Sequence, residues 1–272
     1  MNHEHRRTGQ RVGMVCEPRY RGQVQPAGLR SALARQRDVR VVDVHLADDL
    51  GSCDILVARG RSDAVIDLLE RAERMGLRTL NRGSAVRAVR DKEHMTADLR
   101  AARLPIPETW IGALDELTTR LVDVPFPLVV KPVFGDNCRD VHLVADGAAL
   151  AGVSFPEARA IVQRYLPSDG YDLKLYGIGD AVWAVRKPSP LRPDLSPTAL
   201  PLTATPAQAA LAWRCAHAVG LDLYGVDCID TPGGPVVIEI NDFPNYTGVA
   251  GADDALADFV LSRTFATSIG AR

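Results

Sequence analysis

The sequence predicts a chain of mixed class, in which an α/β region is followed by regions of α+β type. Within residues 1–80, short apolar runs alternate with helical stretches, a rhythm typical of a parallel sheet covered by helices. From residue 127 onward, apolar strands dominate. The clearest pair is 224–229 and 236–240, because both runs are rich in Val and Ile and a Thr-Pro-Gly-Gly turn separates them.

The first region, residues 1–90, has the pattern of a small parallel sheet. Its strands are expected at residues 11–16, 39–44, 54–59 and 77–80. Helices at 26–36 and 62–76 alternate with these strands. The strands are short and almost continuously apolar, as in strands buried on both faces. We therefore expect an N-terminal lobe with its own packed core.

Two further lobes are expected at residues 91–166 and 167–272. The central lobe opens with a helix at 91–102, capped by Asp91, and an extended segment at 104–109 follows. Its strands are expected at residues 127–133, 141–144 and 158–165. In the C-terminal lobe, strands are expected at residues 171–177, 181–187, 224–229 and 236–241, and helices at 206–219 and 253–267.

Composition excludes several classes of protein. The chain has 272 residues and a formal net charge of −2, so no global charge favours nucleic acid or an anionic membrane. It lacks the apolar run of about 18 residues that a membrane helix needs, and its polar start lacks the apolar core of a signal peptide. Five cysteines without CxxC spacing fit a reducing compartment. The sequence therefore predicts a cytoplasmic enzyme that acts on small molecules. A homodimer is possible.

Acidic and amide side chains interrupt the two hairpin strands where apolar residues are expected. Glu239 and Asn241 are two residues apart and therefore share a face of their strand, and Asp227 can join them from the neighbouring strand. Three oxygen ligands on one face suit Mg²⁺, which keeps waters and substrate phosphates for its other positions. The alternative is an ordinary polar sheet face, which the cost of burying unpaired carboxylates disfavours.

A lysine inside an apolar strand marks a candidate phosphate site. Lys131 lies within the run PLVVKPV, where its ammonium must reach solvent or meet an anion. The small polar segment 134–140 follows directly, and its backbone N–H groups could hold a phosphate tail. A lysine at a sheet edge is the ordinary alternative. Lys92, at the start of the helix at 91–102, could equally be a solvated surface residue.

Taken in order, these motifs resemble the ATP-grasp superfamily over residues 80–250. The succession is Asp91-Lys92, VVKP at Lys131, VQRYL at residues 162–166, the D-x-K strand at residues 172–174, Arg186, and then D…E-x-N at Asp227, Glu239 and Asn241. The resemblance implies an ATP-grasp fold, with an N-terminal parallel-sheet lobe and two lobes that clasp ATP. The D…E-x-N set on paired strands is its most specific part.

The resemblance also implies roles for individual residues. Lys92 and Lys131 would hold the ATP phosphates, and the loop around Gly135 would cover them. The linker that binds adenine would consist of Gln163, Arg164, Tyr165 and Leu166. Magnesium would be bound by Asp227, Glu239 and Asn241, with Mn²⁺ as an alternative ion. The catalytic candidates are Lys174 and Arg186; Arg186 is expected to face the same cleft and to stabilise an acyl phosphate, with a structural ion pair as its alternative role.

The sequence departs from the family pattern at two places. The phosphate loop usually contains several glycines, whereas this chain has only Gly135 in the loop. The linker commonly carries Glu where Arg164 stands, so any contact from that acid to the base is absent.

The resemblance implies a ligase that joins a carboxylate to an amine through an acyl phosphate, as ribosomal-protein glutamate ligases and glutathione synthetases do. Small carboxylates and amines would be its substrates. Residues 172–191 also resemble inositol-phosphate kinases, so transfer to a polyol is the alternative; the acidic charge balance and few arginines in the first lobe disfavour it. An inactive nucleotide-binding module is a third hypothesis. The proline-rich loop at 187–202 is expected to cover the acceptor site.

Overall fold

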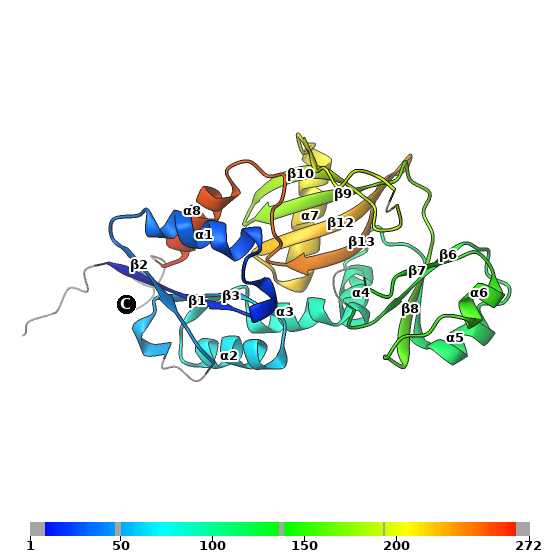
Figure 1. Ribbon diagram of the computed structural model, residues 1–272, viewed down its shortest axis with the longest axis horizontal. Coiled ribbons are helices and arrows are strands. Elements are labelled where there is room, and N and C mark those ends of the chain that lie inside the picture. The colour runs from blue at the N-terminus through cyan, green and yellow to red at the C-terminus, as the bar shows by residue number, and fades with distance from the viewer. Residues whose placement is uncertain (1–8, 47–49, 136–138, 193, 265–272) are drawn as a thin grey trace, which may run out of the picture.

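The computed structural model describes residues 9–46, 50–135, 139–192 and 194–264. It contains three sheets with helices packed against them, and Figure 1 shows the C-terminal sheet between the other two. The mixture of one parallel sheet with antiparallel sheets confirms the predicted fold class. The division into three lobes by residue number stays a prediction.

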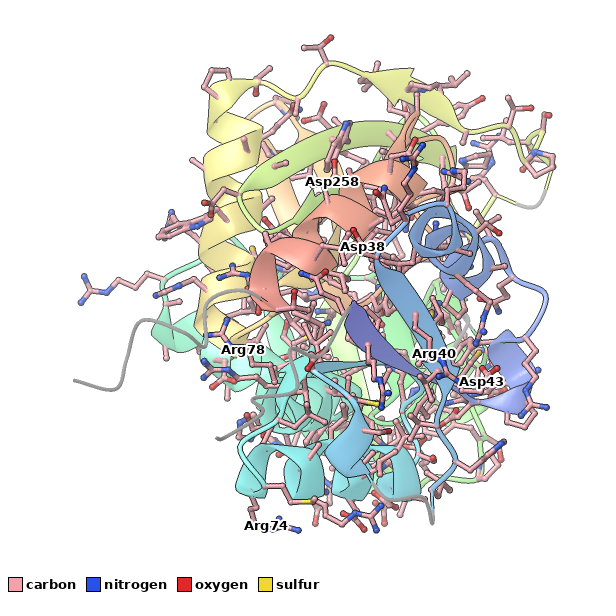
Figure 2. All side chains as sticks on the ribbon, turned by 90° about the vertical axis from the view of Figure 1, so that its left-hand side faces the viewer. Asp38, Arg40, Asp43, Arg74, Arg78 and Asp258 are labelled. Atoms are coloured by element: carbon pink, nitrogen blue, oxygen red, sulfur yellow. The ribbon has the colours of Figure 1, made fainter. Side chains whose placement is uncertain are left out.

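The N-terminal sheet is fully parallel, with the strand order β2-β1-β3-β4. Its strands are β1 (Gln10–Cys16), β2 (Val39–Asp43), β3 (Ile55–Arg59) and β4 (Arg78–Leu80), and the helical segments are η1 (Pro18–Tyr20), α1 (Val24–Ala34), η2 (Leu50–Ser52), α2 (Asp63–Arg74) and α3 (Gly83–Arg90). The edge strand β2 exposes Arg40 and Asp43, which discourages pairing with another chain (Figure 2). Helix α3 was not predicted from the sequence.

The C-terminal helix returns to cover this first sheet. Helix α8 (Ala252–Thr264) packs beside α1 in a shared core that contains Leu29 and Leu256. Gln25 donates a hydrogen bond to Asp253 at 2.5 Å, and Arg35 pairs with Asp254 at 2.6 Å. Helix α8 therefore joins the last region of the described chain to the first one, and Figure 1 shows it beside α1.

The central sheet is antiparallel, with the order β5-β8-β6-β7. Its strands are β5 (Thr109–Ala113), β6 (Leu128–Pro132), β7 (His142–Val144) and β8 (Arg159–Arg164), and its helices are α5 (Leu114–Arg120) and α6 (Gly147–Ala151). Leu117 and Leu150 pack from these helices onto Val130 and Val162 of the sheet. Strand β5 and both helices were missed, because segments of five to seven residues carry little periodic signal.

The C-terminal sheet has the order β11-β10-β9-β12-β13 and is also antiparallel. Its strands are β9 (Tyr171–Ile178), β10 (Ala181–Pro188), β11 (Leu200–Leu202), β12 (Leu223–Thr231) and β13 (Gly234–Asp242). Helices α4 (Lys92–Ala101) and α7 (Pro206–Val219) pack together on one face of this sheet. The opposite face carries the polar residues Asp172 and Lys174 in one part, and in another part it packs Ile178 and Val185 against the first region. No helix in the described residues is long and apolar enough to cross a membrane.

Candidate active site

The paired strands β12 and β13 bring the predicted magnesium ligands onto one face. Asp227 lies directly opposite Glu239, and Gly225 lies opposite Asn241. The amide of Asn241 donates a hydrogen bond to Asp227 at 3.4 Å. The register shifts between Asp227 and Cys228, so a bulge follows the first carboxylate. Two carboxylates and one amide therefore gather at adjacent positions of the sheet.

Lysines from the preceding region approach these acids. The ammonium of Lys92 lies 3.3 Å from Glu239 and also donates to the carbonyl of Gly135, while Lys131 donates to the carbonyl of Ile238 at 3.2 Å. Burial alone would raise the pKa of Glu239, but the charges of Lys92, Lys131 and then Arg61 outweigh it and lower that pKa. Glu239 is therefore ionised at neutral pH. The sequence also predicted a cover loop around Gly135, and its residues 136–138 lie outside the described residues.

A third lysine joins the cluster from β9. Lys174 lies 2.9 Å from Asp227 and 3.4 Å from Asp172. Burial lowers the pKa of Lys174, but the two carboxylates outweigh it and raise that pKa above the ordinary value. Burial is also the main reason why the pKa of Asp172 is raised. Lys174 is therefore a fixed positive charge next to the predicted metal ligands.

The four lysines of the chain all lie in this part of the structure. They are Lys92, Lys131, Lys174 and Lys187, and every other basic side chain among the 32 Lys and Arg residues is arginine. An ammonium is a compact charge that phosphate sites use as a point contact, whereas arginine serves surface ion pairs equally well. The concentration of lysine marks this region as functional.

A cavity of about 170 Å³ opens beside these lysines, between the central and C-terminal sheets, and we call it the nucleotide cavity. One part of its wall is apolar, with Val129, Leu143 and Ile229, and another part carries Lys131 and Glu239. The predicted linker residues Gln163, Arg164, Tyr165 and Leu166 also line it. An apolar wall that continues into charged groups matches the two ends of a nucleotide.

Two linker side chains have structural partners. Gln163 is buried and donates a hydrogen bond to Thr109 at 3.3 Å. Arg164 forms an ion pair with Glu108 at 2.7 Å. Glu108 lies 56 residues away in sequence, so this partner could not be inferred from the linker itself.

This pairing predicts a small effect of the arginine on nucleotide binding. We expect Arg164→Ala to change the dissociation constant for ATP by less than about threefold, because a partly exposed ion pair contributes only about 0–1 kcal/mol. Titration calorimetry with ATP measures the effect. A loss of tenfold or more would show that the guanidinium contacts the nucleotide directly.

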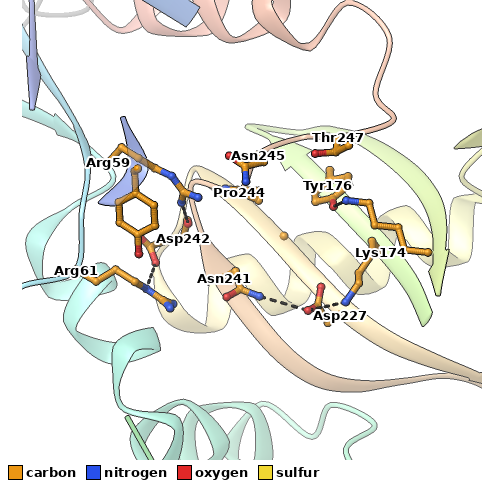
Figure 3. Close-up of a pocket in the computed structure, with 13 residues that line it drawn as sticks. Arg59, Arg61, Lys174, Tyr176, Asp227, Asn241, Asp242, Pro244, Asn245 and Thr247 are labelled. Carbon is orange, nitrogen blue, oxygen red and sulfur yellow. Dashed lines mark hydrogen bonds and ion pairs between the residues drawn. The ribbon is translucent and has the colours of Figure 1, made fainter. Parts of the chain in front are cut away.

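A second cavity, of about 240 Å³, adjoins the first one. Figure 3 shows its polar lining, in which Lys174 and Asp227 come from the C-terminal sheet, while Arg59 and Arg61 come from the end of β3 and the residues after it. Lys174 and Asp227 line the nucleotide cavity as well. The two cavities therefore meet at the predicted metal site, and we call the second one the acceptor cavity.

The arginines of the acceptor cavity follow β3 of the parallel sheet. Arg61 pairs with Asp242 at 2.7 Å, and their side chains are only 9% and 2% exposed. Arg59 lies over the ring of Tyr20, 4.4 Å from its centroid, and donates to the carbonyl of Phe243. These two arginines were not predicted from the sequence to line the site. Their position at the carboxyl end of a parallel strand was the available signal, because ligands bind at that edge of a sheet.

Arg186 does not face the cleft, and that expectation is wrong. In the register of β9 and β10, Arg186 lies opposite the core residue Leu173, whereas Lys187 lies opposite Asp172. Arg186 forms an ion pair with Asp169 and stacks on Tyr171, on the other face of the sheet. Neighbouring residues of a strand point to opposite faces, so Lys187 is the strand cation that lines the acceptor cavity.

The loop after β10 lies over a different cavity from the one predicted. Its residues Ser189 and Arg192 line the nucleotide cavity, together with Pro190 and Leu191. The amide of Ser189 donates to the carbonyl of Gly170 at 2.9 Å, which fixes the start of the loop next to the linker. This part of the loop therefore covers the nucleotide cavity rather than the acceptor cavity.

The three sheets, with two cavities that meet at a cluster of lysines and carboxylates, define an ATP-grasp enzyme. The chain belongs to the RimK-like ATP-grasp family, whose model matches residues 89–257. A probable alpha-L-glutamate ligase of Stenotrophomonas maltophilia (strain R551-3) is 32% identical over 199 residues, which are 68% of each chain. A probable alpha-L-glutamate ligase 2 of Shewanella frigidimarina (strain NCIMB 400) is 28% identical over 265 residues, 86% of this chain and 89% of the relative.

Among solved structures, the RimK domain ATP-grasp protein of Sphaerobacter thermophilus DSM 20745 has the same fold. It superposes with a TM-score of 0.74 at 23% sequence identity, over 92% of this chain and 99% of that chain. The predicted resemblance to the glutamate-ligase branch of the superfamily is confirmed. The chain is an ATP-dependent carboxylate–amine ligase.

Proposed function

We propose that the enzyme phosphorylates a small carboxylic acid and joins it to an amine, with glutamate as one of the two molecules joined. The substrate proposal rests on the name of the relatives, alpha-L-glutamate ligases. In the first step a carboxylate oxygen attacks the γ-phosphorus of ATP, and ADP leaves. In the second step the amine nitrogen attacks the acyl carbon, phosphate leaves, and the nitrogen loses a proton.

The meeting of the two cavities at Asp227 and Lys174 is the observation that carries this proposal. A ligase must bring the γ-phosphate and the acid substrate together in one place, since the phosphoryl group passes directly between them. ATP in the nucleotide cavity would extend its phosphates toward Lys131 and Lys92. The acid in the acceptor cavity would then meet the γ-phosphate beside Lys174.

The oxygen donors on β12 and β13 fit a magnesium site. Asp227 and Glu239 supply carboxylates, Asn241 supplies an amide oxygen, and their pairing on one face of the hairpin favours a shared ion. When bound, Mg²⁺ would supply charge that stabilises the transferred phosphoryl group. Lys92 and Lys174 form ion pairs with these acids in the structure. They would contact phosphate oxygens once the nucleotide and the ion are bound.

The acyl phosphate can be trapped with hydroxylamine. We expect incubation with ATP, Mg²⁺, a carboxylic acid and hydroxylamine to give the hydroxamate of that acid, in amounts equal to the ADP released. The ferric hydroxamate colour and mass spectrometry measure the product. An acid-free reaction is the control, because it reports simple hydrolysis of ATP. Phosphorylation of an inositol or another polyol, without hydroxamate from any acid in a broad panel, would support the kinase alternative instead.

The cytoplasmic location, which rests on composition, and the possible homodimer stay predictions.

A further inference from the structure

The acceptor cavity has an excess of positive charge. Among the described residues that line it, four carry cationic groups and two carry carboxylates, namely Arg59, Arg61, Lys174 and Lys187 against Asp227 and Asp242. Both carboxylates are already paired, Asp242 with Arg61 at 2.7 Å and Asp227 with Lys174 at 2.9 Å. A cavity with this lining favours an anionic ligand.

Lys187 differs from the other cations of the cavity in its partner. Its half-buried ammonium donates to the hydroxyl of Tyr176 at 2.9 Å and lies 5.4 Å from the centre of that ring. Burial raises the pKa of Tyr176, so the phenol stays neutral and does not neutralise the lysine. Burial, followed by the charge of Lys174, lowers the pKa of Lys187. An anion beside Lys187 would therefore be favourable for both the ligand and the protein.

A polar acceptor in the same cavity also lacks a partner. The buried amide oxygen of Asn245 receives no hydrogen bond within the described chain, although Asn245 lines the acceptor cavity. Buried polar atoms are normally hydrogen-bonded, so this amide oxygen marks a place for a hydrogen-bond donor, either of the ligand or of a water that binds with it. The ligand of this cavity is therefore polar.

We propose that the acid substrate carries a second anionic group besides the carboxylate that reacts, and that Lys187, with Tyr176 beside it, binds this second group. This inference rests on the proposed function and assigns the substrate class of its acceptor cavity. The reacting carboxylate lies at Asp227 and Lys174, where the cavities meet. The second anion is held by Lys187 on the neighbouring strand β10, which orients the acid for attack on ATP. The enzyme is therefore selective for diacids.

The test compares diacids with their monoamides, which differ by one charge at almost equal size. Succinate, glutarate and adipate are paired with succinamate, glutaramate and adipamate, and hydroxamate formation gives kcat/KM for each acid. We expect the best diacid to exceed its monoamide by about 10- to 100-fold, the range for a hydrogen bond to a charged group. 3-Phosphonopropionate serves as a further substrate. A preference for it over the dicarboxylates would identify the second anion as a phosphate-like group.

Substitutions at Lys187 and at its neighbour Arg186 then show which side chain causes the selectivity for diacids. Lys187→Met should reduce the ratio of diacid to monoamide to about 1, and Lys187→Arg should retain most of it. Arg186→Met removes the same charge from the adjacent residue on the opposite face and should keep the wild-type ratio. Circular dichroism checks that each variant is folded.

Because the chain has only four lysines, binding can also be read without turnover. The lysines are acetylated with acetic anhydride in the presence of ADP, and mass spectrometry then locates the acetyl groups. We expect the diacid to slow acetylation of Lys187 and its monoamide to have no such effect. Equal kcat/KM for diacids and monoamides in the wild type would overturn the inference. A Lys187→Met variant that lowers kcat/KM for the diacid and for the monoamide by the same factor would also overturn it. Absence of hydroxamate from every acid would instead reject the proposed function, and the acetylation pattern would still test the diacid site.

Discussion

Glu239→Gln is expected to lower kcat by at least about 10²–10³-fold, the typical loss when one charge-stabilising group is removed from a reacting centre. Glu239 lies on β13 directly opposite Asp227, and its carboxylate is held ionised by nearby cations. Glutamine keeps the shape and the hydrogen-bonding capacity but removes the charge that a magnesium ion requires. The release of ADP at saturating ATP, measured across a magnesium titration, gives the effect.

The fold should survive this change. The Glu239 side chain is 23% exposed, so the amide can reach water and no unpaired group is left in a dry core. We expect the melting temperature to stay within a few degrees of the wild type. Glu116→Gln, the same substitution at an exposed position of α5, is the matched control and should keep full activity. Turnover of the Glu239 variant within tenfold of the wild type would contradict the metal assignment.

The sequence predicted the hairpin that carries the candidate metal ligands because every local signal agreed. Two β-branched runs flanked a Pro-Gly-Gly turn, and strand alternation alone placed Glu239 and Asn241 on one face. The structure pairs Asp227 with Glu239 as expected. Local chemistry and the period of a strand were sufficient here, because the turn fixes the register of the two strands.

The face of β10 could not be predicted in the same way. Arg186 and Lys187 are adjacent and both are basic, so the sequence pattern does not decide which of them points toward the cleft. The decision comes from the register against β9, in which Lys187 lies opposite Asp172. A shift of one residue in register exchanges the two faces of a strand. The scarcity of lysine was the one sequence signal that distinguished Lys187 from its neighbour.

Contacts between regions that are distant in the chain could not be predicted from the sequence either. Arg61 reaches Asp242 across 181 residues, and this buried pair joins the N-terminal sheet to the end of β13, the strand with two of the predicted metal ligands. The number of arginines in the first 90 residues is known from the sequence, but the sequence does not show that two of them line the acceptor cavity. The positive charge of that cavity is therefore a property of the assembled fold, in a chain whose formal net charge is −2.

Lys131→Met is expected to weaken the binding of ATP by about 10- to 100-fold, the usual cost of losing a hydrogen bond to a charged group. Lys131 is 7% exposed on β6, and its ammonium lies within 3.2 Å of the carbonyl of Ile238, next to Glu239. Methionine preserves the unbranched apolar stem that packs in the strand and removes only the charge. Titration calorimetry with ATP and with adenosine separates the phosphate contribution from that of the base.

Adenosine is the internal control for this variant, because it would occupy the apolar part of the nucleotide cavity without any phosphate. Its affinity should change by less than about twofold, since Val129, Leu143 and the linker residues are untouched. If Lys131 held β6 against β13 as a structural contact instead, its loss would disturb the whole cavity. ATP and adenosine would then weaken by the same factor, and the assignment of Lys131 to the phosphates would be wrong.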